Sequence, residues 1–359
     1  MSLSDFLQRA MSRWMKEGGP EDDIVLTSRV RVARNLQGYP FPVLQTDSHA
    51  REVIESVARA VASPSMASLG KFELVRCQDL SALDRQVFVE KHLISPDLAQ
   101  QEKHGAMVLR DDELVSIMIN EEDHLRIQCI YPGLRLEDAW KTASAIDDAL
   151  ESQLTYAYHD TYGYLTACPT NVGTGIRASV MMHLPGLVLS GSINRMLTAV
   201  SQVGLAVRGM YGEGSESYGN LFQVSNQITL GETEEEITQN LRSVVYQLIE
   251  HERNARKALL ARNRTQLEDR VSRSFGILAY ARRIDTKETM ERLSDVRLGI
   301  DLGIIQGVSA GILKELMVTT QPAFLQKYSN RELSASERDV RRAALIRERL
   351  RLDDMEVQG

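Results

Sequence analysis

Alternating apolar and polar residues mark several strands in the first two-thirds of the chain. Residues 24–34 (IVLTSRVRVAR) alternate apolar and basic side chains, as a strand with one solvent-facing side would. Residues 105–110, 114–120 and 124–131 follow one another with acidic residues between them, which predicts an antiparallel meander. The same kind of pattern predicts further strands at residues 71–77, 162–168, 176–184 and 221–230.

Apolar residues at helical spacing predict helices between and after these strands. The predicted helices cover residues 48–62, 84–94, 136–157, 190–206 and 233–259. Beyond residue 260 the chain has few strand signals and several helical stretches, and Ser334 and Glu337 there have the spacing of a capping box. At the other end, Leu3, Phe6, Leu7, Met11 and Trp14 repeat at helical spacing, which predicts a short docking helix.

This order of elements predicts an α+β fold, with an antiparallel sheet flanked by helices and followed by an all-α region. We therefore expect three parts: an N-terminal docking helix at residues 1–21, a catalytic domain at 22–257 and a helical C-terminal domain at 258–359. The length of 359 residues is sufficient for more than one hydrophobic core.

Composition narrows the class of protein. A net charge of −7 argues against general nucleic-acid binding, so we expect no direct nucleic-acid partner. The three cysteines are far apart and form no CxxC pair, which indicates neither a disulfide framework nor a zinc site, and no residue is assigned as a metal ligand. No apolar run is long enough to span a membrane, and the N-terminus does not look like a signal peptide. We expect a cytoplasmic protein without membrane contact.

The first predicted strand carries two arginines that could bind an anion. Arg29 and Arg31 are two residues apart, so both side chains leave the same face of the strand. The pair is either a solvated strand face or a bidentate clamp on a polyphosphate, which suits the guanidinium group.

The acidic turn at residues 120–126 reads NEEDHLR. Alone, it is typical of a solvated turn between strands. If its backbone stays extended, Glu122, His124 and Arg126 share one face, and Glu122 is then the glutamate beside a cation. A tight turn at residues 120–123 would break this parity.

The cysteines differ in their surroundings. Cys77 and Cys129 lie in alternating apolar runs and are expected in the core. Cys168 opens the polar stretch CPTNVGTGIR at residues 168–177, where the hydroxyl of Thr170 and nearby arginines could stabilise a thiolate. It is either a partly buried cysteine at a strand end or a reactive thiolate.

A glycine-rich stretch, VRGMYGEGSESYGN, begins at residue 207 and has the composition of a lid over a ligand. The P-loop sequence GxxxxGK[ST] and the HRD and DFG elements of eukaryotic-type protein kinases do not occur. If the chain uses ATP, it binds ATP by another route.

Four motifs, LTSRVRVAR, NEEDHLRI, CPTNVGTGIR and VRGMYGEG…FQVSN, occur in this order. Together they resemble the catalytic domain of the phosphagen (guanidino) kinases, and the resemblance runs from about residue 22 to 255. It implies transfer of the γ-phosphoryl group of ATP, with Mg²⁺, to a guanidinium nitrogen.

The resemblance also implies roles for particular residues. Glu122 would be the catalytic base, and Cys168 would lie against the substrate guanidinium as a thiolate. Arginines would hold the phosphates of the nucleotide, and His92, in the sequence EKHL, would contact it. The implied ATP site comprises Thr27, Ser28, Arg29, Val30, Arg31, His92, Arg126, Arg177, Ala178, Ser179, Val180, Met181, Arg208, Gly209, Met210, Tyr211, Gly212 and Glu213.

Two departures from the small-molecule kinases point to a protein substrate. The first arginine motif begins almost at the N-terminus, so the helical domain that closes over a free amino acid is missing, and a helical domain follows residue 260 instead. This arrangement looks like the bacterial protein arginine kinases of the McsB type. Residues 338–343 (RDVRRA) match the RDxxRA motif of their allosteric phosphoarginine pocket, which implies a site made by Arg338, Asp339, Val340, Arg341, Arg342 and Ala343.

The resemblance implies several partners. Substrates would be proteins with accessible arginines, including a stress-response transcriptional repressor, and phosphoarginine would mark them for degradation by the Clp protease machinery. A zinc-binding activator protein and a homodimer or higher homo-oligomer are also implied. Two alternatives stay open: a kinase for free arginine or another guanidino metabolite, and a phosphoarginine-binding adaptor without catalysis.

Overall fold

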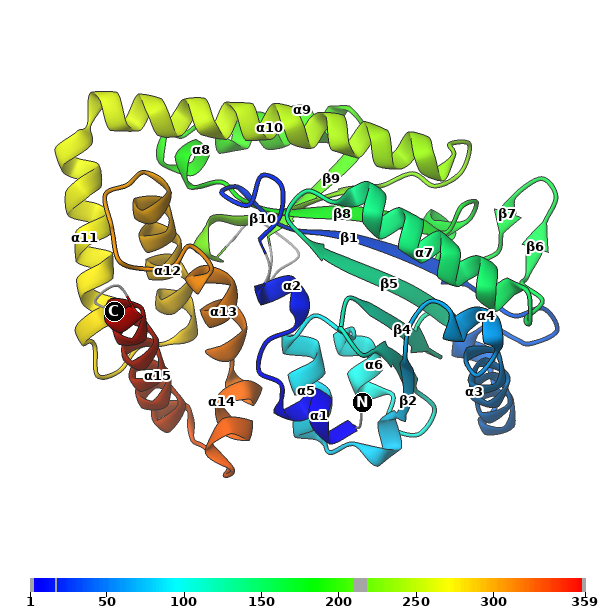
Figure 1. Ribbon diagram of the computed structural model, residues 1–359. Coiled ribbons are helices and arrows are strands. Elements are labelled where there is room, and N and C mark those ends of the chain that lie inside the picture. Colours follow the sequence, from blue (N-terminus) through cyan, green and yellow to red (C-terminus); the bar gives the residue numbers. More distant parts are fainter. Residues whose placement is uncertain (1–2, 17, 210–217, 357–359) are drawn as a thin grey trace. The chain divides into compact units, whose positions relative to one another are not determined.

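The computed structural model describes residues 3–16, 18–209 and 218–356. Its main feature is an eight-stranded sheet with the strand order β2-β3-β4-β5-β1-β8-β10-β9 (Figure 1). The strands are β1 (Val25–Arg34), β2 (Phe72–Arg76), β3 (Ala106–Arg110), β4 (Val115–Ile119), β5 (Leu125–Pro132), β8 (Ile176–His183), β9 (Leu205–Gly209) and β10 (Leu221–Asn226). A small separate sheet pairs β6 (Tyr158–His159) with β7 (Gly163–Tyr164).

The chain divides into two compact units. The first contains residues 1–14, 27–180 and 225–242, and the second contains residues 15–26, 181–224 and 243–359. Each unit therefore contains segments that are far apart in the sequence.

The meander predicted from the sequence is present in the first unit. Strands β2, β3, β4, β5 and β1 pair antiparallel with their neighbours, and β1 is added beside β5. In this register Ala33 lies opposite Arg126. The prediction of an antiparallel α+β fold followed by a helical region is confirmed.

Helix α7 (Leu136–Glu151) packs on one face of this meander, along β5 (Figure 1). Its Asp147 accepts hydrogen bonds from the buried Arg34 at the end of β1, at 2.6 Å from Nη2 and 3.1 Å from Nε. The same guanidinium lies 3.4 Å from the ring centre of Tyr164. Arg34, the last arginine of the first motif, therefore holds the scaffold together.

The N-terminal segment docks as predicted, but as two short helices, α1 (Leu3–Gln8) and α2 (Arg13–Lys16). Phe6 is completely buried in a core cluster that includes Phe88 of α5 (Ala82–Glu90). The buried ammonium of Lys91 donates to the carbonyl of Phe6 at 3.0 Å and to Glu113 Oε1 at 2.6 Å. Ser12 donates to the other oxygen of Glu113 at 2.5 Å, so a buried ion pair attaches this segment to the first unit.

The remaining helices before residue 234 are short, apart from α3. They are α3 (Asp47–Val61), α4 (Pro64–Ala67), α6 (Pro96–Gln100), α8 (Pro185–Leu189) and α9 (Ile193–Gln202). Among the described residues, no helix has the combination of length and apolar character that a membrane span requires.

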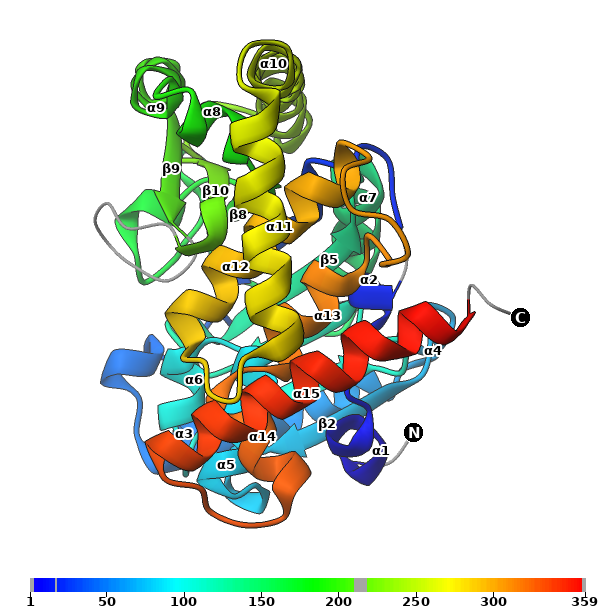
Figure 2. The same cartoon turned by 90° about the vertical axis from the view of Figure 1, so that its left-hand side faces the viewer.

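The part of the chain described after residue 233 is helical, as predicted. It contains α10 (Glu234–Arg262), α11 (Arg264–Tyr280), α12 (Thr286–Asp301), α13 (Ile312–Thr319), α14 (Pro322–Ser329) and α15 (Ala335–Glu356). Helix α11 packs against both α12 and α15 (Figure 2). The capping box expected at the start of α15 is present, because Ser334 Oγ accepts from the backbone of Glu337 and the Glu337 carboxylate accepts from the backbone of Ser334.

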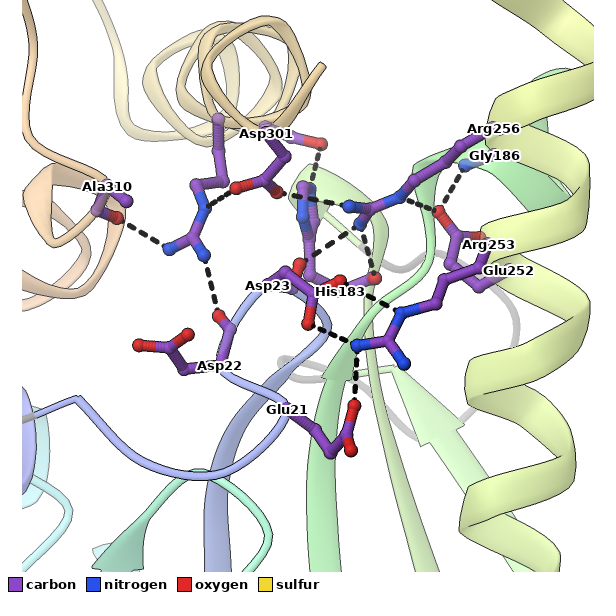
Figure 3. Close-up of polar contacts among 12 residues, drawn as sticks. Glu21, Asp22, Asp23, His183, Gly186, Glu252, Arg253, Arg256, Asp301 and Ala310 are labelled. Carbon is purple, nitrogen blue, oxygen red and sulfur yellow. Dashed lines mark hydrogen bonds and ion pairs between the residues drawn. The ribbon is translucent and has the colours of Figure 1, made fainter. Parts of the chain in front are cut away.

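A network of ion pairs in the second unit connects α10 and α12 to the short segment before β1 (Figure 3). The buried Arg256 lies 2.6 Å from Glu252 and 3.1 Å from Asp301, and it donates to the carbonyl of Asp23. Arg253 lies 2.9 Å from Asp23 Oδ1. Each buried charge has partners, which offsets the desolvation that burying it requires.

Four predicted elements differ from the structure. The expected strand at 162–168 is reduced to β7. The backbone N–H of Leu165 donates to the carbonyl of Ala157 and that of Ala167 donates to the Asp123 side chain, so neither group takes part in strand pairing. The strand at 221–230 ends at Asn226, whose side chain bonds the backbone of its neighbours. The helix at 136–157 ends at Glu151, and the helical stretch at 190–206 shortens to α9.

Candidate functional site

Four of the five arginines predicted to hold phosphate come from adjacent strands of the first unit: Arg29, Arg31, Arg126 and Arg177. Arg29 and Arg31 alternate along β1 with buried Val30 and Val32, so they share a face of the sheet. Residues directly opposite on neighbouring strands also share a face, and Arg126 of β5 lies opposite Ala33. Arg126 is therefore on the same face as Arg29 and Arg31.

Burial and mutual repulsion change the acidity of these arginines. Burial, and then the charge of Arg126, lower the pKa of Arg29 to about 10. Burial lowers the pKa of Arg31 well below its usual value, and the charges of Arg29, Arg126 and Arg177 lower it further. The buried Nε of Arg31 has no hydrogen-bond partner among the described residues. Four cations thus lie close together with excess positive charge, and a polyphosphate would compensate it.

His92 lies beside this cluster. Its backbone has a φ of 59°, in the left-handed region, and its carbonyl accepts a hydrogen bond from Gln128 at 2.8 Å. The ring makes an edge contact with that of Trp14, with centroids 5.8 Å apart. Burial, and then the charge of Arg29, lower the pKa of His92 to about 4, so the ring is neutral at physiological pH.

The backbone of residues 120–126 is not extended throughout, so the expectation that Glu122, His124 and Arg126 share one face does not hold. Asn120 has a φ of 56°, and its backbone N–H donates to the carbonyl of His124, so residues 120–124 form a tight turn between β4 and β5. His124 is buried, and its Nδ1 accepts the backbone N–H of Leu36 at 3.0 Å. It therefore supports the scaffold and does not share a wall with Glu122.

Glu122 nevertheless lies beside a cation, because the turn brings it back to β5. Its Oε2 accepts from Arg126 Nη2 at 2.8 Å, and Arg126 Nη1 lies 2.8 Å from Glu121 Oε2. The Glu122 side chain is 44% exposed, whereas that of Glu121 is buried. Partial burial raises the pKa of Glu122, the charge of Arg126 opposes this, and the neighbouring carboxylates add to it. Of the two glutamates, Glu122 is the one that solvent and a substrate can reach.

Cys168 differs from the other two cysteines, as expected. Cys77 and Cys129 are buried in the core, and burial raises their pKa to about 11 and about 12. Cys168 is half-buried, and its Sγ lies 3.0 Å from the hydroxyl oxygen of Thr170. The Thr170 hydroxyl is therefore within hydrogen-bond distance of the sulfur, and the role of Cys168 as a thiolate stays a prediction.

Asp123 connects the two catalytic candidates, and sequence analysis missed it. Its buried Oδ1 accepts the backbone N–H of Ala167 at 2.7 Å and the amide of Asn35 at 2.6 Å. The residue after Glu122 is therefore bonded to the residue before Cys168. The only sequence signal is its place in the acidic turn, where it looks like one more solvated carboxylate.

The other expected nucleotide-site residues of β1 and β8 have buried side chains. Ser28 Oγ donates to the carbonyl of Gly133 and accepts from the backbone N–H of Arg135, both at 2.9 Å, so its hydroxyl stabilises the scaffold. Ser179 Oγ lies 3.5 Å from Arg29 Nε. The others in this group are Thr27, Val30, Ala178, Val180 and Met181.

Arg208 and Gly209 end β9 and belong to the second unit, whereas Arg29, Arg31, Arg126 and Arg177 belong to the first. The Arg208 side chain is exposed. The expected contacts at Met210, Tyr211, Gly212 and Glu213 lie outside the described residues.

The RDVRRA motif lies on α15, where its two outer arginines have different environments. Arg342 is buried and donates to the carbonyls of Thr320 at 2.8 Å and Ile284 at 3.0 Å, and to Asp339 at 2.8 Å. Arg338 is nearer the surface and donates to the carbonyl of Leu333 at 3.0 Å. The charge of Arg338 is close enough to contribute to a lowered pKa of Arg342, which burial mainly causes.

The other residues of this motif are apolar or lie beside an aromatic ring. Val340 is half exposed, Ala343 is buried, and the Arg341 guanidinium lies 5.7 Å from the ring centre of Tyr328. Arg283, which sequence analysis missed, lies 3.4 Å from Asp339 and is mostly exposed.

Two protein-family models together match most of the chain. Residues 52–255 match "ATP:guanido phosphotransferase, C-terminal catalytic domain". The chain belongs to the ATP:guanido phosphotransferase family. Residues 264–358 match a second model, "Protein-arginine kinase McsB C-terminal domain". The resemblance to the guanidino kinases, and to their McsB-type branch, is confirmed.

Curated relatives match this family member along almost its whole length. The chain is 58% identical over 354 residues to a protein-arginine kinase of Halalkalibacterium halodurans, and the alignment covers 99% of each chain. It is 54% identical over 353 residues to a protein-arginine kinase of Bacillus subtilis, with 98% of this chain and 97% of the relative covered.

Solved structures of the family share the fold at low sequence identity. The crystal structure of a lombricine kinase has a TM-score of 0.56 and 24% identity, covering 66% of this chain and 68% of the other. A duplicated taurocyamine kinase of Schistosoma mansoni has a TM-score of 0.57 and 23% identity, covering 74% of this chain and 39% of the other. These similarities support the fold alone.

ATP is the phosphoryl donor that the family name implies, and the arginine cluster is suited to it. The unpaired Arg31 Nε and the crowding of four guanidiniums fit a polyphosphate. The part of the chain that the structure describes contains no group of three or more His, Cys, Asp or Glu side chains able to hold a metal ion. Mg²⁺ commonly binds through substrate phosphates and water.

Proposed function

We propose that this chain is an ATP-dependent protein arginine kinase, which transfers the γ-phosphoryl group of ATP to arginine side chains of proteins. The observation that carries the proposal is the position of Glu122, which contacts Arg126 at the edge of a cluster of four arginines. A carboxylate base next to a polyphosphate-binding cation cluster is the arrangement that phosphorylation of a guanidinium needs. The names of the curated relatives support a protein substrate.

The residue types match the chemistry. A free guanidinium has a pKa of about 13.8, so its nitrogen becomes a nucleophile only when a proton is removed. Glu122 accepts that proton, the nitrogen forms a bond to the γ-phosphorus, and the bond from phosphorus to the bridging oxygen of ADP breaks. Arg29, Arg31, Arg126 and Arg177 stabilise the anionic transition state.

Other residues position the reactants. His92 is neutral and approaches the nucleotide without adding charge. Cys168, next to the Thr170 hydroxyl, places a polarisable sulfur against the cationic substrate. We assign Arg208 and the following residues to the phosphate side as well. Mg²⁺, when bound to ATP, neutralises part of the phosphate charge.

We also propose a role for each part of the chain. Residues 1–21 dock the N-terminus, residues 22–257 form the catalytic domain and residues 258–359 form the regulatory helical domain. Arg283 is exposed and Arg338 and Asp339 are partly exposed, and we propose that they form the accessible part of a phosphoarginine pocket in the helical domain. Arg342 positions Asp339 in it.

The cellular role that we propose follows from the resemblance to the McsB-type kinases. Phosphoarginine would mark substrates, including a stress-response repressor, for the Clp protease machinery, and a zinc-binding activator protein would stimulate the reaction. Because the reaction consumes ATP, we propose a cytoplasmic location. A homodimer or larger homo-oligomer is the assembly that we expect, and light scattering measures it.

The decisive experiment compares substrates. The full-length protein is incubated with ATP, Mg²⁺ and a folded basic protein, and phosphate is mapped by mass spectrometry without acid. We expect label on arginine. Label confined to Ser, Thr or Tyr contradicts the proposal, and turnover of free L-arginine without protein labelling supports a metabolite kinase instead. Binding of phosphoarginine peptides without any ATP consumption would indicate an adaptor.

A further inference from the structure

A cavity of about 410 Å³ opens beside Glu122 in the first unit. Its wall includes Glu121 and Glu122 from the turn after β4, and Ala167, the neighbour of Cys168 in the chain. Other lining residues come from the turn at residues 42–46 and the start of α3. The cavity is thus lined both by the proposed base and by a surface turn.

Two residues that line this cavity, Gln45 and Asn120, have a side-chain acceptor without a partner among the described residues. Asn120 donates from Nδ2 to the carbonyls of Ala50 at 3.0 Å and His104 at 2.9 Å, which fixes its amide. Its buried Oδ1 has no partner among the described residues, and neither has Oε1 of Gln45. A buried acceptor without a partner destabilises the protein, so a ligand that donates N–H groups here would compensate that loss.

The surface turn beside the cavity presents two apolar side chains to solvent. Val43 is 82% exposed and Leu44 is 74% exposed. Both belong to a short 3-10 helix, Pro42–Leu44, which a hydrogen bond from Leu44 N to Phe41 O closes at 2.8 Å. Directly after it, Thr46 caps α3 by accepting the backbone N–H of His49. These contacts on both sides hold the turn in place, so its apolar side chains do not have to be ordered on binding.

The two sets of features are complementary to one kind of ligand. The exposed carboxylate of Glu122 and two amide oxygens without a partner favour a ligand that is cationic and rich in N–H donors. The exposed Val43 and Leu44 require an apolar group next to it. Free arginine satisfies the carboxylates but leaves the apolar turn uncovered, whereas a polypeptide can satisfy both.

We propose that the turn at residues 41–46 is the docking site for the polypeptide around the target arginine. The guanidinium of the arginine lies towards Glu122, and an apolar side chain adjacent to it in the substrate packs on Val43 and Leu44. Backbone N–H groups of the substrate donate to Gln45 Oε1 and Asn120 Oδ1. This inference rests on the proposed function and assigns to it a sequence preference: arginines with an apolar neighbour.

The test uses two peptides that differ only beside a single arginine, one with leucine there and one with serine. For the wild-type protein we expect a kcat/KM that is roughly fivefold to tenfold higher for the leucine peptide, because part of one aliphatic side chain is buried. The variant V43S/L44S changes only exposed side chains. We expect it to lose this preference, to phosphorylate the serine peptide as the wild type does, and to keep the wild-type KM for ATP.

Two further variants make the test specific. The control V203S replaces an exposed apolar residue of the second unit and is expected to retain the preference. Gln45→Leu keeps the approximate size of the side chain and removes the acceptor, and we expect it to raise the KM for both peptides roughly threefold to tenfold, at unchanged kcat.

The outcomes distinguish a failure of the docking site from a failure of the proposed kinase activity. Equal kcat/KM values for the two peptides in the wild type, or an undiminished preference in V43S/L44S, overturn the docking site while the kinase activity stands. A wild-type protein that phosphorylates no peptide or protein arginine overturns the proposed function, and the docking site with it.

Discussion

Asp123 accepts the backbone N–H of Ala167 at 2.7 Å, and this bond joins the turn of Glu122 to the segment of Cys168. The two segments are more than forty residues apart in the chain, so their relative position depends on a few contacts of this kind. A bond from an N–H group to an ionised carboxylate is among the stronger ones in proteins. The proposed base, Glu122, and the thiol of Cys168 thus lie on segments that are joined in the absence of a substrate.

The first prediction concerns this bond. Asp123→Asn keeps the shape of the side chain but removes the charge that strengthens its bonds to Ala167 and Asn35. We expect kcat for protein arginine phosphorylation to fall roughly tenfold to a hundredfold, because small displacements of reacting groups are costly. The KM for ATP should stay near the wild-type value. A fall in ATP affinity equal to the fall in kcat would mean that Asp123 acts on the whole domain.

The second prediction tests the base. Glu122→Gln removes the proton acceptor and keeps the size of the side chain, so we expect phosphoryl transfer to fall by roughly two to four orders of magnitude. ATP binding, measured by calorimetry, should be retained, because Arg126 keeps its contact with Glu121. The matched control is Glu121→Gln, which removes the negative charge of the buried neighbouring carboxylate and keeps the size of its side chain. A fully active Glu122→Gln protein would show that another group accepts the proton.

The third prediction is a pH dependence. The proposed base Glu122 would act in its ionised form, so we expect activity to fall as the pH decreases through its pKa. Partial burial raises this pKa, so the acid limb of kcat/KM should lie at higher pH than for an ordinary glutamate. The charge of Asp97 contributes to the rise, and Asp97→Asn should therefore move the acid limb to lower pH. An unchanged profile in Asp97→Asn would mean that a different group controls the limb.

The fourth prediction concerns stability. Lys91 and Glu113 are both completely buried and lie 2.6 Å apart. Lys91→Met leaves a buried carboxylate without its counter-ion, and we expect the free energy of unfolding to decrease by about 3–5 kcal/mol in urea titrations. The double variant Lys91→Met, Glu113→Gln should be less destabilised than the single one, because neither charge then remains unpaired. Equal losses in both variants would show that the hydrogen bonds of Lys91 to the N-terminal segment dominate.

The sequence allowed prediction of those features that depend on local pattern. The strand at residues 24–34 and the meander after residue 105 are present. Every residue of β4 is buried, so the acidic residues between the runs, and not alternating burial, indicated the meander. In β1 a period of two puts alternate residues on the same face. Arg29 and Arg31 share one face of β1 for this reason. The contrast between Cys168 and the core cysteines followed from their neighbours in the sequence.

Features that depend on tertiary contacts were not predictable in this way. The turn at residues 120–124 reverses the chain through a positive φ at Asn120, which parity along an extended strand does not anticipate. The backbone N–H of Leu165 donates to the carbonyl of Ala157, and that of Ala167 donates to the side chain of Asp123, so a strand-like sequence there forms no ladder. Asp123 and His124 became part of the scaffold because of Asn35 and Leu36, which are nearly ninety residues away.

The fifth prediction separates binding from stability in the RDVRRA motif. Arg342 is buried and bonds two backbone carbonyls from other helices and loops, so Arg342→Ala should unfold at lower urea concentration, with a loss of about 3–5 kcal/mol.

The Arg338 side chain donates to the backbone carbonyl of Leu333, five residues away, and lies nearer the surface than Arg342. Arg338→Ala should therefore change stability by no more than about 1 kcal/mol. If Arg338 contributes a guanidinium to a phosphoryl group, the same variant should weaken binding of a phosphoarginine peptide by roughly tenfold or more, measured by fluorescence anisotropy. Arg331→Ala, which removes another exposed arginine of this region, is the matched control and should bind as the wild type does. Wild-type affinity in Arg338→Ala would exclude this side chain from the pocket, whatever the stability of the two variants.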